Sequence, residues 1–251
     1  VQNNFEGNDR MKRKILQQLI DWKNSNSRKP LILNGARQVG KTFILREFGR
    51  EYYKNTVYVN LESNSAAASL FGSNISPKKL IKYLEAETGE RIIPNDTLVI
   101  LDEIQSCERA VTSLKYFYEE APEYHIAAAG SLLGVAINRN QTSFPVGKVN
   151  ILRLYPLDFE EFVTAIGHDM LLDEIRNCYS NKTPMNDALH NTADGFAILV
   201  AVIAFKIGNT ENYTKNYQTE VGEYTVTAVF QSQNYNVIGE LQTTLIIKSS
   251  M

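Results

Sequence analysis

Near the start of the chain, an apolar segment is followed by glycine, lysine and threonine in a pattern that suits phosphate binding. Gly35-Ala36-Arg37-Gln38-Val39-Gly40-Lys41-Thr42 has the form Gly-x-x-x-x-Gly-Lys-Thr and comes directly after residues 30–34, Pro-Leu-Ile-Leu-Asn. The two glycines allow backbone N–H groups to turn toward a phosphate chain, and a helix that begins at the lysine adds its positive N-terminal end. All eight residues are therefore predicted to form a phosphate-binding loop. In it, Lys41 binds the β- and γ-phosphates and the Thr42 hydroxyl holds Mg²⁺.

Two carboxylates follow a second apolar segment further along the chain. Residues 98–101 are Leu-Val-Ile-Leu, and Asp102 and Glu103 come next. A carboxylate at the end of a buried strand suits Mg²⁺, so Asp102 is the second predicted metal residue. Glu103 is then placed to polarise a water molecule for attack on the γ-phosphate. An exposed acidic strand end without catalytic function is the alternative, and the phosphate-binding loop in the same chain disfavours it.

An alternation of strands and helices supplies the framework that these segments need. The sequence predicts strands at 30–34, 56–60, 97–101 and 125–129, and helices at 10–23, 41–53, 76–88 and 108–120. This alternation indicates an α/β fold, in which a parallel sheet is flanked by helices on both faces, as in P-loop NTPases. The strand at 56–60, between the loop strand and the acidic strand, indicates the subclass of these hydrolases that uses a catalytic glutamate.

Composition argues against a disordered chain and against a protein that spans a membrane. The chain has 251 residues, of which 43% are hydrophobic and 22% are charged, and this balance fits a chain with a buried core. Its net charge of −2 gives no overall attraction to nucleic acid or to an anionic membrane surface. Cys107 and Cys178 match no metal or redox spacing, and the longest apolar run, 196–205, is too short for a bilayer-spanning helix. Because residues 1–10 also lack a signal-peptide pattern, we expect a soluble, cytoplasmic protein without a membrane partner.

Charged residues are distributed unevenly along the chain. Only eight of them lie in residues 191–251, which contain no arginine and are rich in Thr, Asn, Tyr and Val. We therefore expect a nucleotide-binding core at 1–154, a small helical, lid-like segment at 155–190, and a β-rich tail at 191–251. Residues 1–10, before Met11, are a candidate for sequence upstream of the functional start.

Four motifs, in order, resemble a family of prokaryotic AAA-type ATPases whose C-terminal domain is often described as nuclease-like. They are the phosphate-binding loop, Leu-Asp-Glu-Ile-Gln at 101–105, Ala-Gly-Ser-Leu-Leu-Gly at 129–134, and Phe-Pro-Val-Gly-Lys-Val at 144–149, followed by Tyr-Pro-Leu-Asp-Phe-Glu-Glu-Phe at 155–162. The resemblance covers approximately residues 9–190 and implies an AAA+ core of five parallel strands that binds ATP and Mg²⁺. By the same analogy, Ser131 is a polar sensor of the γ-phosphate or the attacking water. Ser131 as the N-cap of a helix at 132–138 is the alternative, and both roles are compatible.

The resemblance also raises the question of an arginine finger. Lys148 stands where many relatives have arginine, and a positive charge there could touch the nucleotide or a neighbouring subunit. Lysine lacks the bidentate fork of arginine, however, so a role for Lys148 is the less favoured interpretation. Arg37 lies inside the loop, and Arg109, Arg139 and Arg153 are candidates by position alone. The predicted function is Mg²⁺-dependent ATP hydrolysis coupled to an unidentified process. The alternative is a nucleotide-gated binding module or switch with negligible turnover, which the lack of an evident finger favours. A homo-oligomer or protein partner is possible, and DNA is a partner by family analogy only.

The part of the chain after residue 190 departs from the family pattern. Residues 155–178 predict two short helices, and residues 222–230 and 240–248 predict strands joined by a polar turn at 233–236. The apolar run at 196–205 is either a short strand or a buried helix, and periodicity does not decide between them. The tail is a β-rich appendage, the product of a frame change or gene fusion near residue 190, or a divergent form of the family's C-terminal domain. We favour an interruption or fusion.

Overall fold

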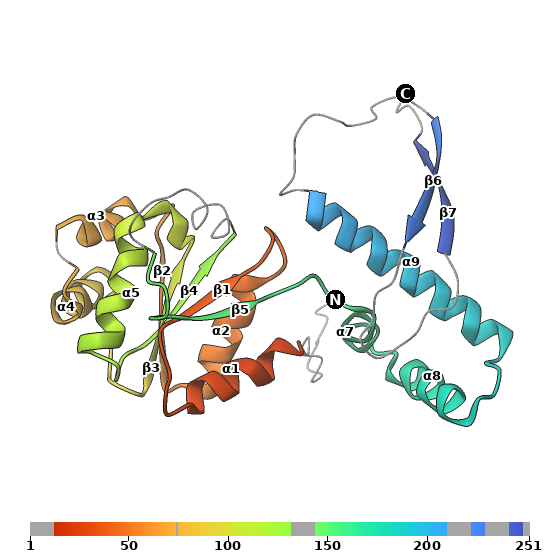
Figure 1. Ribbon diagram of the computed structural model, residues 1–251, viewed down its shortest axis with the longest axis horizontal. Coiled ribbons are helices and arrows are strands. Elements are labelled where there is room, and N and C mark those ends of the chain that lie inside the picture. Colours follow the sequence, from red (N-terminus) through yellow and green to blue (C-terminus); the bar gives the residue numbers. More distant parts are fainter. Residues whose placement is uncertain (1–12, 74, 132–143, 210–221, 229–240, 248–251) are drawn as a thin grey trace, which may run out of the picture. The chain divides into compact units, whose positions relative to one another are not determined.

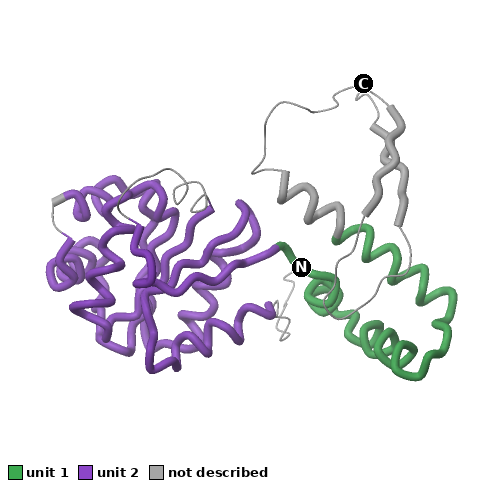
Figure 2. Tube along the Cα trace, in the orientation of Figure 1, with its two compact units in different colours: residues 1–12, 156–251 green, residues 13–155 purple. Residues whose placement is uncertain are grey.

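The computed structural model describes residues 13–73, 75–131, 144–209, 222–228 and 241–247. These residues fall into two compact units (Figure 2). The first, coloured purple and labelled unit 2 in Figure 2, runs from Arg13 to Tyr155. The second, coloured green and labelled unit 1, contains the chain from Pro156 onward. The expected core boundary at residue 154 thus lies beside the boundary between the units.

A parallel sheet of five strands forms the centre of the first unit, and the α/β fold expected from the sequence is confirmed (Figure 1). Its order is β2-β3-β4-β1-β5, and every pairing in it is parallel. The strands are β1 (Leu31–Asn34), β2 (Asn55–Asn60), β3 (Thr97–Asp102), β4 (His125–Gly130) and β5 (Asn150–Arg153). β5 supplies the fifth strand that the family resemblance implied.

The spatial order of the strands differs from their order in the chain. In the sheet, β4 lies between the loop strand β1 and the acidic strand β3, whereas β2 lies at the edge. The strand at 56–60, which became β2, therefore lies between β1 and β3 in the sequence but not in the sheet. Each parallel pairing requires a crossover connection, and such a connection leaves the chain free to skip a position in the sheet.

Helices cover both faces of this sheet (Figure 1). α1 (Ile15–Asn24) and α2 (Lys41–Tyr52) lie on one face, and α3 (Ser65–Ser73), α4 (Pro77–Thr88) and α5 (Glu108–Glu120) lie on the other. α2 buries Ile44, Leu45 and Phe48, whose spacing places them on one side of a helix. α3 was not predicted from the sequence, and it buries Ala67 and Phe71 one turn apart. The core thus consists of two apolar layers separated by the sheet.

The second unit begins with a short helical cluster. α7 (Phe159–Ala165) starts at a capping box, in which the Asp158 side chain accepts from the Glu161 N–H and the Glu161 carboxylate accepts from the Asp158 N–H. Val163 of α7 is buried together with Leu171 and Leu172 of α8 (Asp169–Asn181). The two helices expected within 155–178 are therefore present.

The expectation of a β-rich tail from residue 191 is wrong for residues 191–209, which are helical. They belong to α9 (Asp187–Asn209), so the apolar run at 196–205 is a helix and the expected boundary at 190 falls inside it. Ala193 and Phe196 pack against the helical cluster and Val200 is buried, a spacing typical of one helix face. Within the described residues, no helix has both the length and the apolar character needed to cross a membrane.

Two strands follow α9 and agree with the sequence. β6 (Gly222–Ala228) and β7 (Leu241–Ile247) pair antiparallel, with Gly222 opposite Ile247. The predicted turn at 233–236 lies outside the described residues, as do residues 1–12.

Candidate functional site

The predicted motifs meet at the edge of the sheet where the parallel strands end. Asn34, the last residue of β1, is paired with Gly130 at the end of β4, and Asn60 of β2 is paired with Asp102 at the end of β3. The phosphate-binding loop follows Asn34 directly in the sequence, Glu103 follows Asp102, and Ser131 follows Gly130. In open α/β sheets the carboxyl ends of the strands are where ligands bind.

The phosphate-binding loop needs glycine at two positions for different reasons. A Cβ atom on Gly35 would lie 2.3 Å from the carbonyl oxygen of Leu154, so the close approach of two backbone segments excludes a side chain there. Gly40 has a φ of 93°, in the left-handed region that favours glycine, and it is the N-cap of α2. Gln38 also has a positive φ, of 64°. The loop therefore has the sharply turned backbone that the motif predicts.

Lys41 lies inside the loop, with only 7% of its surface exposed. Its Nζ donates hydrogen bonds to the carbonyl oxygens of Gly35 and Ala36, at 2.7 and 2.6 Å. These bonds hold an ammonium group at the first turn of α2, where the helix N-terminus adds positive potential. The arrangement suits an anion with several oxygens.

Thr42 and Asp102, the two predicted metal residues, are in direct contact. The Thr42 hydroxyl donates to Oδ2 of Asp102 at 2.8 Å, across 60 residues of sequence. Because the hydroxyl gives its proton to the carboxylate, its lone pairs remain available to a cation. Hydroxyl and carboxylate oxygens are the ligands that Mg²⁺ prefers, so the residues present fit this ion.

Asp102 also accepts two hydrogen bonds that the motifs did not predict. The Tyr58 hydroxyl donates to Oδ2 at 2.9 Å, and the Glu103 backbone N–H donates to Oδ1 at 3.0 Å. Burial raises the pKa of Tyr58, and the Asp102 carboxylate raises it further, so the phenol keeps the proton that it donates. The Arg46 guanidinium lies 3.8 Å from the centre of the Tyr58 ring.

Glu103 has an unusual backbone. Its φ of 49° lies in the left-handed region, which is costly for a residue with a side chain and is often found at functional sites. A short 3₁₀ turn, η1 (Ile104–Ser106), follows, and the Gln105 amide donates to the Glu103 carboxylate. Gln105 belongs to a motif quoted for the family, but its contact with Glu103 was not predicted from the sequence.

Ser131 follows β4 and is buried. Its hydroxyl oxygen has no hydrogen-bond partner among the described residues. A buried hydroxyl without a partner calls for an explanation, and a ligand group at this edge of the sheet is one. The helix at 132–138 that Ser131 was expected to cap lies outside the described residues, as does Arg139.

Arg13 contacts the loop directly, although it lies 26 residues before Val39 in the sequence. It is buried, and it donates from Nη1 to the Val39 carbonyl at 3.2 Å and from Nη2 to the Tyr155 carbonyl at 2.6 Å. The guanidinium therefore joins the phosphate-binding loop to the chain beyond β5. Both contacts are made to backbone groups far away in sequence, so no motif signals them.

Of the other charged candidates, Arg37 belongs to the loop itself and Arg153 is paired with Asn34 at the carboxyl edge, whereas Lys148 lies away from the site. Lys148 precedes β5 and forms an ion pair with Glu119 at 3.1 Å, which places it at the amino edge of the sheet. β1 has four residues at about 3.3 Å each, so the two edges are roughly 13 Å apart. This position disfavours a contact of Lys148 with nucleotide in its own chain, in agreement with the preference for no role. Arg109 donates to the Phe71 carbonyl, and Arg37 and Arg153 are exposed.

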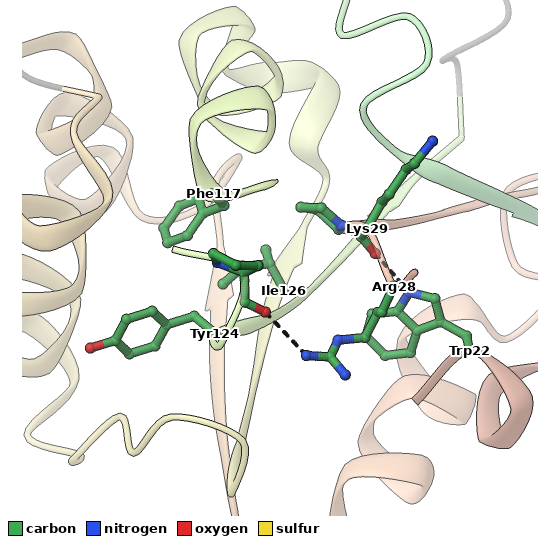
Figure 3. A pocket seen from close by; sticks show the side chains of 8 residues that line it. Trp22, Arg28, Lys29, Phe117, Tyr124 and Ile126 are labelled. Carbon is green, nitrogen blue, oxygen red and sulfur yellow. Dashed lines mark hydrogen bonds between the residues drawn. The ribbon is translucent and has the colours of Figure 1, made fainter. Parts of the chain in front are cut away.

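A pocket at the amino edge is too small to be a second candidate for a ligand site (Figure 3). Trp22 donates to the Lys29 carbonyl at 2.8 Å and Arg28 to the Pro122 carbonyl at 3.1 Å, which draws its walls together. Between its described lining residues, which also include Phe117, Tyr124 and Ile126, there is no enclosed space for even a water molecule.

A comparison with known protein families matches the part of the chain that contains the candidate site. The sequence profile of a family described as "AAA domain" matches residues 27–163. Among solved structures, the Orc1 protein of Aeropyrum pernix in complex with DNA matches with 16% identity and a TM-score of 0.39, over 61% of this chain and 46% of that one. Cdc6p from Pyrobaculum aerophilum matches with 16% identity and a TM-score of 0.39, over 78% and 61%.

A third structure is the replication initiator DnaA bound to AMPPCP and single-stranded DNA. It matches with 14% identity and a TM-score of 0.39, over 79% of this chain and 62% of that one. The match spans less than two thirds of the length of each of these three solved chains. No curated protein matches the sequence.

Proposed function

The chain belongs to the AAA domain family, and from this premise we propose that it binds ATP and hydrolyses it with Mg²⁺. The observation that carries the proposal is the 2.8 Å hydrogen bond between Thr42 and Asp102. It joins the phosphate-binding loop to the acidic strand end, so the two halves of a metal-dependent phosphate site form one unit. The roles of the individual residues follow from their positions in this unit.

The loop and Lys41 would bind the phosphates. Backbone N–H groups of residues 35–42 and the first turn of α2 offer donors and positive potential to the phosphate oxygens. Lys41 would exchange its bonds to the Gly35 and Ala36 carbonyls for bonds to the β- and γ-phosphates. Its burial keeps the ammonium group close to this point and limits competition from water.

Thr42 and Asp102 would hold Mg²⁺, directly or through water. When bound, the ion offsets the negative charge that develops on the phosphates during transfer. The hydrogen bond between the two side chains fixes where the Thr42 lone pairs lie, and the Glu103 N–H fixes the other carboxylate oxygen.

Glu103 would act on the water that attacks the γ-phosphate. A carboxylate within reach of a water molecule polarises it and accepts its proton. The left-handed backbone at Glu103 turns the chain sharply at the end of β3, and the Gln105 amide restrains the carboxylate. Ser131, at the end of the neighbouring strand, would contact the γ-phosphate or the same water.

The experiment compares ATP binding and phosphate release by the wild-type chain and by Lys41→Ala. Loss of a charged partner costs about 2–5 kcal/mol, so the affinity for ATP should fall roughly 30- to 5000-fold. Lys148→Ala is the matched control, because this lysine lies at the other edge of the sheet and should leave binding unchanged. A Lys41→Ala protein that binds and hydrolyses ATP like the wild type would refute the proposal.

A switch with negligible turnover is the second candidate. It is supported by Arg109, one of the arginines proposed by position, because its side chain is engaged with the Phe71 carbonyl. Turnover per chain, measured over a range of protein concentrations, separates the two candidates. Turnover that rises with concentration indicates an arginine supplied by another copy, and ATP binding with negligible turnover at every concentration indicates the switch. DNA binding is not proposed, because the net charge of −2 offers DNA no overall attraction.

A further inference from the structure

Tyr58 contacts the candidate metal site from outside the sequence motifs. It lies on β2, the edge strand, and its hydroxyl shares Oδ2 of Asp102 with the Thr42 hydroxyl. The register explains how it reaches this carboxylate. Tyr58 is paired with Ile100 and Asn60 with Asp102, and residues two apart on a strand share a face. Tyr58 and Asp102 therefore project from the same face of the sheet.

The hydrogen bonds to Asp102 occupy most of the acceptor positions of its carboxylate. An ionised carboxylate has about four lone-pair positions, and three donors reach this one. The terminal torsion of an aspartate side chain is otherwise loosely held. With the Glu103 N–H on one oxygen and two hydroxyls on the other, Thr42, Tyr58 and the Glu103 backbone together fix the plane of the carboxylate.

The position of the tyrosine ring is itself secured by α2. Arg46 lies four residues after Thr42, so both side chains are on the same face of the helix. Its guanidinium covers the Tyr58 ring at 3.8 Å, a distance at which a cation is attracted to the ring face. α2 thus contacts Asp102 directly through Thr42 and indirectly through Arg46 and Tyr58.

We propose that Tyr58 is a positioning residue for the metal site, which holds Asp102 in the orientation that turns the lone pairs of Thr42 toward Mg²⁺. The identity of the ion rests on the proposed function, whereas the arrangement rests on the contacts above. Without the Tyr58 hydroxyl, Oδ2 loses one of its two donors, the carboxylate gains freedom to rotate, and the Thr42 hydroxyl follows it. Affinity for the ion should fall while the phosphate contacts of the loop stay intact.

The test uses Tyr58→Phe, which removes one oxygen atom and keeps the ring under Arg46. The affinity for a non-hydrolysable ATP analogue is measured by calorimetry in EDTA and at increasing Mg²⁺ concentration. Residues that orient a metal ligand typically contribute 10- to 100-fold to metal affinity. We expect the Mg²⁺ concentration for the half-maximal increase in affinity to rise about 10- to 100-fold, with the affinity in EDTA unchanged.

Tyr53→Phe is the matched control. Tyr53 is also a tyrosine with a hydroxyl in hydrogen-bond contact, but its partner is His125 at the amino edge. Its removal should leave both the affinity in EDTA and the Mg²⁺ dependence at wild-type values. If Tyr58→Phe fails to fold, Arg46→Ala serves instead, because it removes the cover of the ring without touching Asp102, and it should shift the Mg²⁺ dependence in the same direction.

Each outcome has a defined meaning. A Mg²⁺ dependence in Tyr58→Phe equal to that of the wild type overturns the inference alone. An equal loss of affinity with and without Mg²⁺ also overturns it, since that result indicates a purely structural residue. A wild-type chain that binds no nucleotide, or binds it equally well in EDTA, overturns the proposed function together with the inference.

Discussion

The two edges of the central sheet use the same kinds of side chain for opposite purposes. At the carboxyl edge, the Tyr58 hydroxyl donates to Asp102, and the neighbouring groups are Thr42, a turned loop and a lysine. At the amino edge, Tyr53 Oη lies 2.8 Å from Nδ1 of His125, and the neighbouring groups are the rings of Trp22 and Phe48. A tyrosine paired with a titratable group therefore does not by itself mark a functional site.

The surroundings of each pair decide its role. The carboxyl edge receives the N-terminus of α2, with free N–H groups and positive potential, so anions and the metal ions that accompany them are favoured there. The amino edge receives the C-terminal part of the same helix, and there Phe48 and Tyr53 are in edge-to-face contact. At the carboxyl edge, two hydroxyls donate to the same oxygen of Asp102. At the amino edge, aromatic rings contact both Tyr53 and His125. Four predictions test how sharply these two edges are separated.

Glu103→Gln should produce the largest effect. Removal of a general base typically costs about 10²- to 10⁴-fold in rate, so turnover should fall by that factor while ATP affinity and stability stay unchanged. Steady-state phosphate release measures turnover, calorimetry measures ATP affinity, and urea denaturation measures stability. Glu119→Gln is the control, because Glu119 is paired with Lys148 at the amino edge and should keep full turnover. Equal turnover in Glu103→Gln and the wild type would remove Glu103 from the mechanism.

Phe48→Ala should destabilise the fold without changing the site. Phe48 is completely buried, and truncation of such a side chain costs about 3–5 kcal/mol in the free energy of unfolding, measured by urea denaturation. Phe43→Ala on the same helix should cost less than about 0.5 kcal/mol, because Phe43 is half exposed. If folded Phe48→Ala also loses affinity for Mg²⁺ and nucleotide, the two edges are coupled through α2 and not independent.

The buried histidine should make stability depend on pH. Burial, together with the smaller effect of the positive charges of Arg28 and Lys23, lowers the pKa of His125 from 6.5 to about 4. The unfolded chain therefore takes up the proton more readily than the folded chain. Stability should be full above pH 6.5 and decline as the pH falls toward about 4, by up to about 3 kcal/mol.

Urea denaturation between pH 4 and 7 measures this decline, and His125→Gln should reduce it. A wild-type profile that is flat over this range, or one that His125→Gln leaves unchanged, would show that the histidine is not held neutral by the amino edge.

Gly49→Ala should have the smallest effect of the four. A Cβ atom at Gly49 would lie 2.4 Å from the Thr56 hydroxyl oxygen, so α2 or β2 must shift, at a cost of about 1–3 kcal/mol. Gly72→Ala is the control, because nothing lies within 4 Å of its added Cβ and alanine favours the helix by about 1 kcal/mol. Thermal unfolding of the two variants gives the comparison, and similar melting temperatures would contradict the tight contact between α2 and β2.

Local patterns made much of the carboxyl edge predictable. The loop, Lys41 and Thr42 are contiguous, and Asp102 ends a strand whose apolar run is visible in the sequence. Contacts to this edge from elsewhere were not predictable. Tyr58 reaches Asp102 through strand register, and Arg13, which precedes α1, reaches Val39 across 26 residues of sequence. The place of Lys148 was likewise not predictable, because its distance from the site depends on which end of β5 it precedes.

The part of the chain after residue 190 shows the same division. The alternating residues of β6 and the β-branched residues of β7 identified two strands, whereas the apolar run at 196–205 fits either a strand or a helix. Packing of Phe196 against the helical cluster, including an edge-to-face contact with Phe162, accompanies the helix that forms there. For a short apolar segment, the partner surface and not the periodicity selects the structure.

By itself, the sequence determined the type of fold and the chemical groups of the candidate site. Both depend on residues close together in the chain: the period of apolar positions, the spacing of glycines and the residues at strand ends. Only the tertiary structure decided that β4 separates β1 from β3, that Thr42 contacts Asp102, and that Tyr58 and Arg46 join them. These are relations between segments far apart in the chain, such as Thr42 and Asp102, which are separated by 60 residues. They follow from the order and register of strands, which crossover connections leave free until the chain packs.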